Sequence, residues 1–144
     1  MQVLLVLFAS LLFFRLLGLA GVIAFSTWLA SARVALATMF LFTAISHFTP
    51  MKKDLVAMVP PGLPRPDLLV SVTGVAELAG ALGLLFEPTR FWAACGLMIL
   101  MVLMFPANVS AARRGTLIRG RQATALWMRA PMQVLFLAWA WVVR

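Results

Sequence analysis

The chain has 144 residues, of which 64% are hydrophobic and only 11% are charged, with twelve Lys and Arg against four Asp and Glu. Its formal net charge of +8 would attract phosphate, but most of the basic residues stand at the ends of apolar stretches or in two loops. This distribution argues against a nucleic-acid-binding domain. The single cysteine excludes an internal disulfide and a CxxC redox pair.

Five apolar stretches follow one another along the chain, each about as long as the roughly 20 helical residues that cross a hydrocarbon core of about 30 Å. They are apolar nearly all round, unlike the amphipathic helices of a soluble protein. We therefore predict an all-α integral membrane helix bundle that forms one domain over residues 1–144. The five predicted spans cover about residues 2–25, 29–48, 68–86, 91–109 and 125–143.

The first two predicted spans are separated only by residues 26–28, so they are expected to form a tight antiparallel hairpin. An alternative is that the first stretch is a signal peptide, with residues 30–32 as its small-residue cleavage site. Against this alternative, no Lys or Arg precedes the apolar run, Arg15 interrupts it, and the run is too long. We therefore predict that the first span is retained.

A polar link over residues 49–67 holds five of the eight prolines and cannot be helical at residues 60–64. Residues 50–59 are expected to form a short amphipathic turn, with Leu55, Val56 and Met58 entering the membrane interface. The second long link, residues 110–124, is basic and is predicted to be solvated. Its basic residues are Arg113, Arg114, Arg119 and Arg121.

The two long links lie on the same side of the predicted membrane and hold seven Lys and Arg. The opposite side has Arg33, Arg90 and Arg144. The positive-inside rule places the richer side in the cytoplasm. We therefore predict a multi-pass protein of the inner (plasma) membrane, with the N-terminus in the cytoplasm and the C-terminus outside.

Glu77 stands near the middle of the third predicted span, where a charge costs about 2.5–3.5 kcal/mol on insertion scales. Gly74, Gly80 and Ala81 on the same helix are small enough for a neighbouring helix to approach closely. Two interpretations remain open. Either Glu77 is an acid on a packing helix held by a buried partner, or it binds a ligand or handles protons.

Arg15 is the expected partner of Glu77. Counted inward from the cytoplasmic helix ends, the two residues differ in depth by about 6 Å, which a long Arg side chain can span. Arg129, on the fifth span, either reaches the same acid or extends outward to the interface. We predict an intramembrane polar cluster or ligand-binding set made of Arg15, Glu77, Arg129 and Gln133.

His47, the only histidine, stands at the cytoplasmic end of the second span, and Asn108 ends the fourth span at the same level. We treat the two as a candidate pocket at this end. The alternative is that His47 is a helix-end residue whose polar tip seeks water.

Zinc needs three or four ligands, and Asp54, Asp67 and Glu77 are too scattered to supply them, so we predict no metal site. No nucleophile elbow, P-loop or dinucleotide fingerprint is present, and no catalytic residue is assigned.

The segment from Thr43 to Ala112 resembles the DoxX-like family of small integral membrane proteins. The motifs that carry the resemblance are His47-Phe48, Met58-Val59-Pro60 with Leu63-Pro64, Thr73-Gly74-Val75-x-Glu77-Leu78-x-Gly80, Gly83-Leu84-Leu85, Thr89-Arg90 and Phe105-Pro106-Ala107-Asn108. The resemblance implies a compact four-helix membrane core, here preceded by an additional N-terminal span. It also implies that His47, Glu77 and Asn108 are pocket residues.

Namesakes of the DoxX-like family are membrane subunits of a thiosulfate:quinone oxidoreductase, so the resemblance implies an accessory role in a membrane redox system. We expect a quinone or similar apolar ligand between the helices, no independent catalytic activity, and an oxidoreductase subunit as partner. The alternatives are a non-enzymatic scaffold that recruits a partner or anionic lipids and a small proton or solute transporter. The bilayer itself is an expected partner, and a homo-oligomer is compatible with the small-residue helix face.

Overall fold

The computed structural model describes residues 2–118 and 120–144, and its regular elements in this part of the chain are helices and one two-stranded hairpin, joined by short links. The long helices are α1 (Gln2–Leu19), α2 (Trp28–Ser46), α4 (Pro66–Leu85), α5 (Arg90–Arg114) and α6 (Leu126–Val143). The short elements are the 3-10 turn η1 (Ile23–Phe25), α3 (Lys52–Met58), and the strands β1 (Leu117–Ile118) and β2 (Arg121–Gln122). The predicted all-helical bundle is confirmed.

Each of the five long helices is long and apolar enough to cross a membrane. Large apolar side chains also point outward from them, such as Leu5 on α1, Val72 on α4 and Leu103 on α5, each more than half exposed. An outward-facing apolar surface of this extent is what a surrounding hydrocarbon phase favours and water does not. These features suggest a multi-pass membrane protein.

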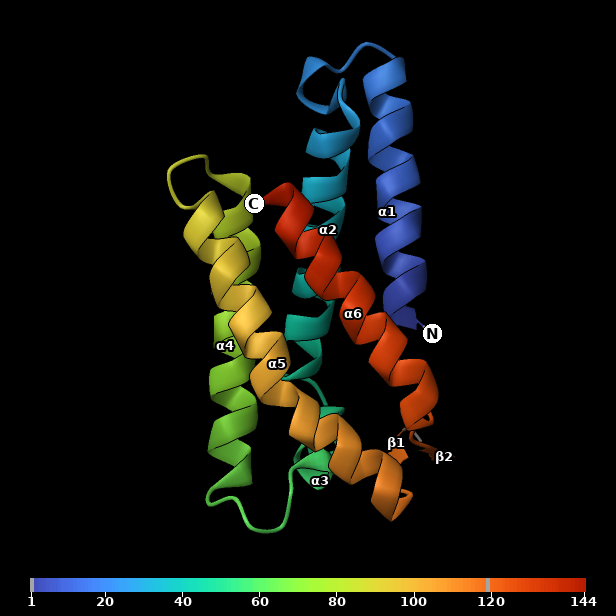
Figure 1. Ribbon diagram of the computed structural model, residues 1–144, viewed down its shortest axis with the longest axis vertical. Helices are drawn as coiled ribbons and strands as arrows, with labels where there is room; N and C mark the ends of the chain where they lie inside the picture. Colours follow the sequence, from blue (N-terminus) through green and yellow to red (C-terminus); the bar gives the residue numbers. More distant parts are fainter. Residues whose placement is uncertain (1, 119) are drawn as a thin grey trace.

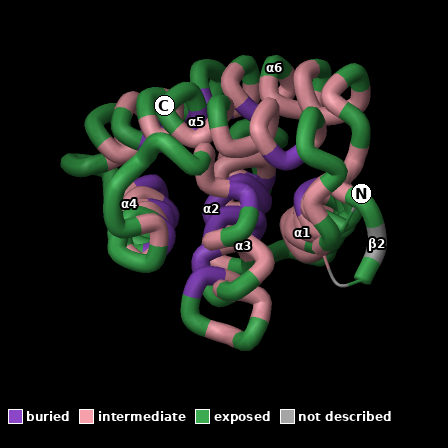
Figure 2. The backbone as a smooth tube through the Cα atoms, turned by 90° about the horizontal axis from the view of Figure 1, so that it is seen from below, coloured by how far each residue is buried: buried purple, intermediate pink, exposed green. Residues whose placement is uncertain are grey.

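Helix α2 is the centre of the bundle (Figure 1). It packs against α4 and α6, while α5 contacts both α4 and α6, so these four helices form a closed ring. Helix α1 packs mainly against α2, outside that ring. Figure 2 shows the consequence, because buried residues concentrate on α2 whereas α1 is largely exposed or half-buried.

The turn between α1 and α2 makes the first helix shorter than the predicted span. The helix ends at Leu19, and Gly21 follows with a positive φ of 100°, a conformation that suits glycine and stops a helix. Helix α2 then begins behind Thr27, whose hydroxyl accepts a hydrogen bond from the Ala30 amide at 3.1 Å. The tight antiparallel hairpin expected from the short link is therefore present.

Small residues let α4 approach its neighbours closely. A Cβ atom placed on Gly80 would lie 2.5 Å from the side chain of Leu97, and one on Gly83 would lie 2.8 Å from the Ala93 side chain. No real Cβ tolerates such distances, so glycine at these positions sets the α4–α5 spacing. This close approach was expected from the sequence around Glu77.

Helix α5 is longer than predicted. The apolar run ends near residue 109, but the helix continues to Arg114 and closes with Gly115 in the left-handed conformation at φ 61°. Cations favour a helix C-terminus, so Arg113 and Arg114 extend the helix where hydropathy alone would end it. The rest of the basic link is not an open loop, because β1 and β2 pair antiparallel within it.

Candidate functional site

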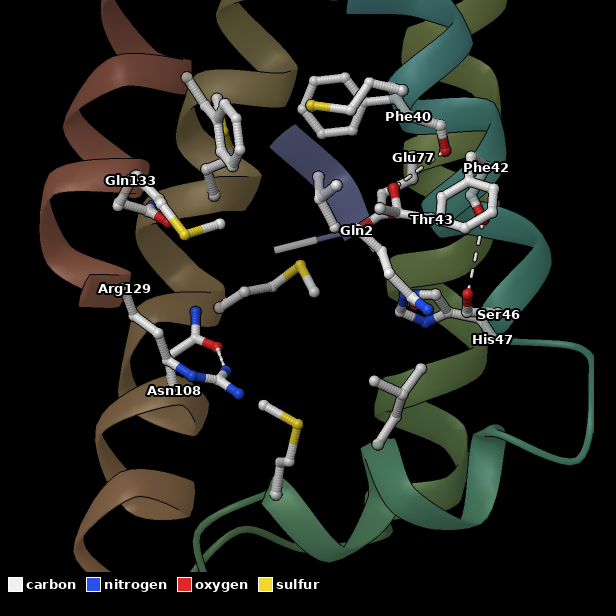
Figure 3. A pocket seen from close by; sticks show the side chains of 18 of the residues that line it. Gln2, Phe40, Phe42, Thr43, Ser46, His47, Glu77, Asn108, Arg129 and Gln133 are labelled. Atoms are coloured by element: carbon white, nitrogen blue, oxygen red, sulfur yellow. Dashed lines mark hydrogen bonds and ion pairs between the residues drawn. The ribbon is translucent and has the colours of Figure 1, made fainter. Parts of the chain in front are cut away.

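A cavity of about 320 Å³ lies inside the ring of helices, at the end of the bundle where α3 and the β1–β2 hairpin lie. Side chains from α2, α4, α5 and α6 form its walls, and the lining residues at and in α3, which we call its floor, are Met51, Leu55 and Met58. Figure 3 shows α3 below the cavity. The volume falls at the small end of ligand pockets. Six of the chain's nine methionines line it: Met39, Met51, Met58, Met101, Met104 and Met132.

The acidic wall of this cavity is a pair of buried side chains, Glu77 on α4 and His47 at the end of α2. They are 5% and 3% exposed, and Glu77 Oε1 lies 3.6 Å from His47 Nε2. The other imidazole nitrogen, Nδ1, lies 2.6 Å from the Val70 carbonyl oxygen. Since a carbonyl only accepts, Nδ1 carries a hydrogen and Nε2 faces the carboxylate.

Gly74 makes room for this pair. A Cβ atom on Gly74 would lie 2.5 Å from the Cβ of His47 and 2.8 Å from its Cγ. The imidazole therefore packs directly against the backbone of α4, one turn before Glu77, and any side chain at position 74 would displace it. The Thr73 hydroxyl donates at 3.0 Å to the Val70 carbonyl, the same oxygen that His47 Nδ1 approaches.

The pKa of His47, which lies just beyond the last residue of α2, is raised from its ordinary value. Burial works in the opposite direction and lowers it, but the hydrogen bonding and negative charge of Glu77 outweigh burial, with a further contribution from the Val70 carbonyl. The imidazolium form is therefore favoured beside the carboxylate.

The carboxylate of Glu77 is only half satisfied. Its second oxygen, Oε2, is buried and has no hydrogen-bond partner among the described residues. Across the cavity, the side-chain nitrogen Nε2 of Gln133 on α6 is in the same condition. Buried polar atoms are nearly always paired in native proteins, so two orphans lining one cavity are an unusual combination.

The opposite wall is cationic. Arg129 lies one helical turn before Gln133 on α6, and its Nη1 donates to Asn108 Oδ1 on α5 at 2.6 Å while its Nε donates to the Thr124 carbonyl at 2.9 Å. Figure 3 shows these side chains on the side of the cavity away from His47 and Glu77. Asn108 thus positions the guanidinium and does not bond to His47.

The predicted pairing of Arg15 with Glu77 is wrong. Arg15 Nη1 donates to the Ser26 carbonyl at 2.9 Å, and the guanidinium lies 5.2 Å from the centre of the Trp28 ring, at the far end of the hairpin. The two residues are far apart because α1 does not begin at the level of the other helices: Gln2 already lines the same cavity as Glu77. Thirteen residues further on, Arg15 is about 20 Å away along the helix axis. Arg15 therefore stabilises the turn between α1 and α2.

The floor of the cavity is anchored by Arg114. Its Nη2 donates to the carbonyls of Ala57, Met58 and Val59, at 2.8, 3.2 and 3.0 Å. Ala57 and Met58 end α3 and Val59 follows it, so these carbonyls lack partners within the helix. The short turn predicted at residues 50–59 is present as α3, and its Leu55 and Met58 line the cavity.

Comparison with known proteins identifies the family but not an activity. The sequence model of a family described as a domain of unknown function (DUF8561) matches residues 36–144. The chain belongs to the DUF8561 family. No curated protein and no solved structure matches it. The matched segment contains every cavity residue of the DUF8561 chain except Gln2 and Val3, which come from α1.

Of the residues predicted for the site, Glu77, Arg129, Gln133, His47 and Asn108 line one cavity of this DUF8561 protein, and Arg15 does not. Sequence reasoning missed the methionine lining. The signal was present, since nine methionines in 144 residues is a high number, but their convergence depends on helix rotation. Among the described residues, no group of three or more His, Cys, Asp or Glu is arranged to hold a metal ion.

Proposed function

We propose that this DUF8561 protein is a multi-pass membrane protein whose cavity binds a small, largely apolar ligand with hydrogen-bonding oxygens, of the quinone type. The observation that carries the proposal is the buried Oε2 atom of Glu77, which has no hydrogen-bond partner among the described residues. Glu77 is 5% exposed, and the cavity that it lines is mainly apolar. Leaving such an atom unpaired costs about 1–3 kcal/mol, more for a charged group. A ligand that bonds to it recovers that free energy.

The distribution of polar groups supports a quinone in particular. A quinone is a flat apolar ring with an oxygen at each of two opposite ends. The cavity has polar groups on two opposing walls, Glu77 with His47 on one and Arg129 with Gln133 on the other, separated by methionine and aromatic side chains. Methionine is unbranched and adaptable, so this lining accommodates both a ring and a flexible chain.

The role in a redox system is that of an accessory. The only cysteine, Cys95 on α5, has no thiol partner within the chain and does not line the cavity. Electrons would therefore be exchanged with a partner oxidoreductase subunit. The DoxX-like motifs at His47, Glu77 and Asn108 support the same role, because all three residues belong to the cavity wall.

The proposed topology places the α3 end of the bundle in the cytoplasm of a bacterial cell, and the C-terminus outside. The test uses a Cys95→Ala background with one new cysteine, either Gly62→Cys beside α3 or Pro88→Cys in the α4–α5 turn; both positions are exposed. A membrane-impermeant maleimide applied to spheroplasts should label position 88 and reach position 62 only after permeabilisation. The reverse pattern would reject the orientation.

Ligand occupancy tests the proposed function. The detergent-purified protein is analysed by native mass spectrometry and by solvent extraction of quinones, comparing wild type, Glu77→Gln and the matched control Glu87→Gln. Glu87 is exposed in the turn after α4, so its substitution controls for the loss of one carboxylate. Wild type and Glu87→Gln should retain a quinone-sized ligand that Glu77→Gln loses. A ligand-free wild type, with Glu77→Gln merely unstable, would favour a scaffold with a structural His47–Glu77 pair.

A further inference from the structure

The hydrogen-bonding direction at Glu77 is fixed by its neighbours. Val70 offers a carbonyl oxygen 2.6 Å from His47 Nδ1, so that nitrogen donates and Nε2 is the atom left to face Glu77 Oε1. If both Nε2 and Oε1 lacked a hydrogen, two lone pairs would oppose each other at 3.6 Å. One proton is therefore held between these two atoms, on one or the other.

The second oxygen of Glu77 is an acceptor in both arrangements. With the proton on His47, the carboxylate is ionised and Oε2 has only lone pairs. With the proton on Oε1, Oε2 is the carbonyl oxygen of a neutral acid, which also only accepts. This oxygen is buried, lines the cavity and has no partner among the described residues. The acidic wall therefore requires a hydrogen-bond donor from the ligand.

The two oxidation states of a quinone-type ligand differ in this respect. The quinone has two carbonyl oxygens and no donor, so it would place lone pairs against Glu77 Oε2. The quinol has two hydroxyl groups, one of which can donate to that oxygen. We infer that the cavity selects the reduced, hydroxyl-bearing form of its ligand over the oxidised form, and that Glu77 determines this specificity.

The cationic wall anchors either form without discriminating between them. Arg129 has only donors, and two of its nitrogens already bind Asn108 and the Thr124 carbonyl, which fixes the guanidinium in place. The unpaired amide nitrogen of Gln133 is a further donor on this wall. A quinone carbonyl and a quinol hydroxyl oxygen both accept from such donors.

The inference rests on the proposed function, and one titration separates the two. Decylubiquinol and decylubiquinone are titrated separately, under anaerobic conditions, into the full chain in nanodiscs, with ascorbate present in the quinol series. Because only the quinol can donate to the buried Oε2 of Glu77, we expect the quinol to bind at least about tenfold more tightly than the quinone. Equal affinities, or a tighter quinone, would overturn the inference while the proposed function stands. Binding of neither form would overturn both.

Variants assign the preference to its residue. In Glu77→Gln, the amide can turn its NH₂ group toward a carbonyl, so the affinity ratio should fall to near one. Gln133→Met removes a donor from the non-discriminating wall and should weaken both forms by a similar factor, leaving the ratio intact. The Glu87→Gln control should match wild type. If Glu77→Gln fails to fold, the wild-type ratio still decides whether the reduced form is preferred, and an unchanged ratio in Gln133→Met excludes the opposite wall as the source of that preference. An unchanged ratio in a folded Glu77→Gln would reject the assignment to Glu77.

Discussion

The same four helices build two different halves of the bundle. In the packed half, between the α4–α5 turn and the bundle centre, Ala35, Leu84, Ala94 and Val143 have no exposed surface. In the cavity half, toward α3, the helices carry methionine and polar side chains around an open volume of about 320 Å³. The difference is one of side-chain size and polarity along continuous helices.

This difference shows how a small bundle holds a cavity open. Glycine and alanine in the packed half bring α4 against α5 until Leu97 meets Gly80 and Ala93 meets Gly83. Close-packed interiors transmit position with little give. The helices therefore enter the cavity half at fixed spacing, and Glu77 Oε2 and Gln133 Nε2 remain unpaired because the two walls cannot collapse onto one another.

The largest expected contrast is between truncations in the two halves. Leu84→Ala removes a fully buried side chain from the packed half and should lower the free energy of unfolding by about 2–5 kcal/mol. Met104→Ala enlarges a cavity that already exists and should cost less than about 1 kcal/mol, because the side chain has fewer packed neighbours to lose. Denaturation in mixed micelles measures both. Equal losses would remove the distinction between the halves.

The contact between Gly74 on α4 and His47 can be tested by adding a methyl group. Gly74→Ala displaces His47 from α4 and should lower the free energy of unfolding by about 1–3 kcal/mol. It should also weaken ligand binding. Gly96→Ala is the matched control, since a Cβ there meets nothing within 4 Å, and it should be neutral or stabilising by about 0.5–1 kcal/mol. Thermal unfolding and ligand titration measure the two effects. A harmless Gly74→Ala would contradict the described packing of His47.

The stability of α3, which forms the floor of the cavity, should depend on the guanidinium of Arg114. Arg114→Gln removes donors from the carbonyls of α3 and should cost about 1 kcal/mol while raising hydrogen exchange in residues 52–58. Its neighbour Arg113 is exposed, so Arg113→Gln should leave exchange in α3 unchanged. Similar exchange in both variants would show that α3 does not rely on Arg114.

The smallest effect concerns the protonation of His47. Its pKa is raised in the folded protein, so the stability it contributes is fully present below the unfolded pKa of about 6.5 and is lost as the pH rises through the folded pKa. The melting temperature of wild type should fall over that range. Glu77→Gln, which lacks the charge that raises the pKa, should show a weaker dependence. A melting temperature that rises with pH would contradict the pair.

Much of the architecture could be predicted from the sequence. Hydropathy located all five long helices, and glycine spacing on the third predicted span indicated its close contacts. The end of α5 was misplaced, because a helix that continues past the apolar run is stabilised by Arg113, Arg114 and Gly115, which hydropathy does not register.

The site was predicted only in part. A carboxylate within an apolar span pointed to Glu77, but its partner depended on where each helix begins relative to the others. Because α1 begins beside the cavity, Arg15 lies beyond reach, and His47 at the end of α2 forms the pair instead. Helix stagger and rotation of this kind are tertiary properties that residue counting along single spans does not contain.

The measurement that tests the central claim most directly is photolabelling of the wild-type protein in nanodiscs with an azido-quinone, followed by peptide mapping. Labels should fall on the cavity half, at Met101, Met104 or Met132, and excess unlabelled decylubiquinol should prevent them. Labels confined to outward-facing residues such as Ile99 and Leu103, with no protection by the quinol, would contradict a binding cavity inside the bundle.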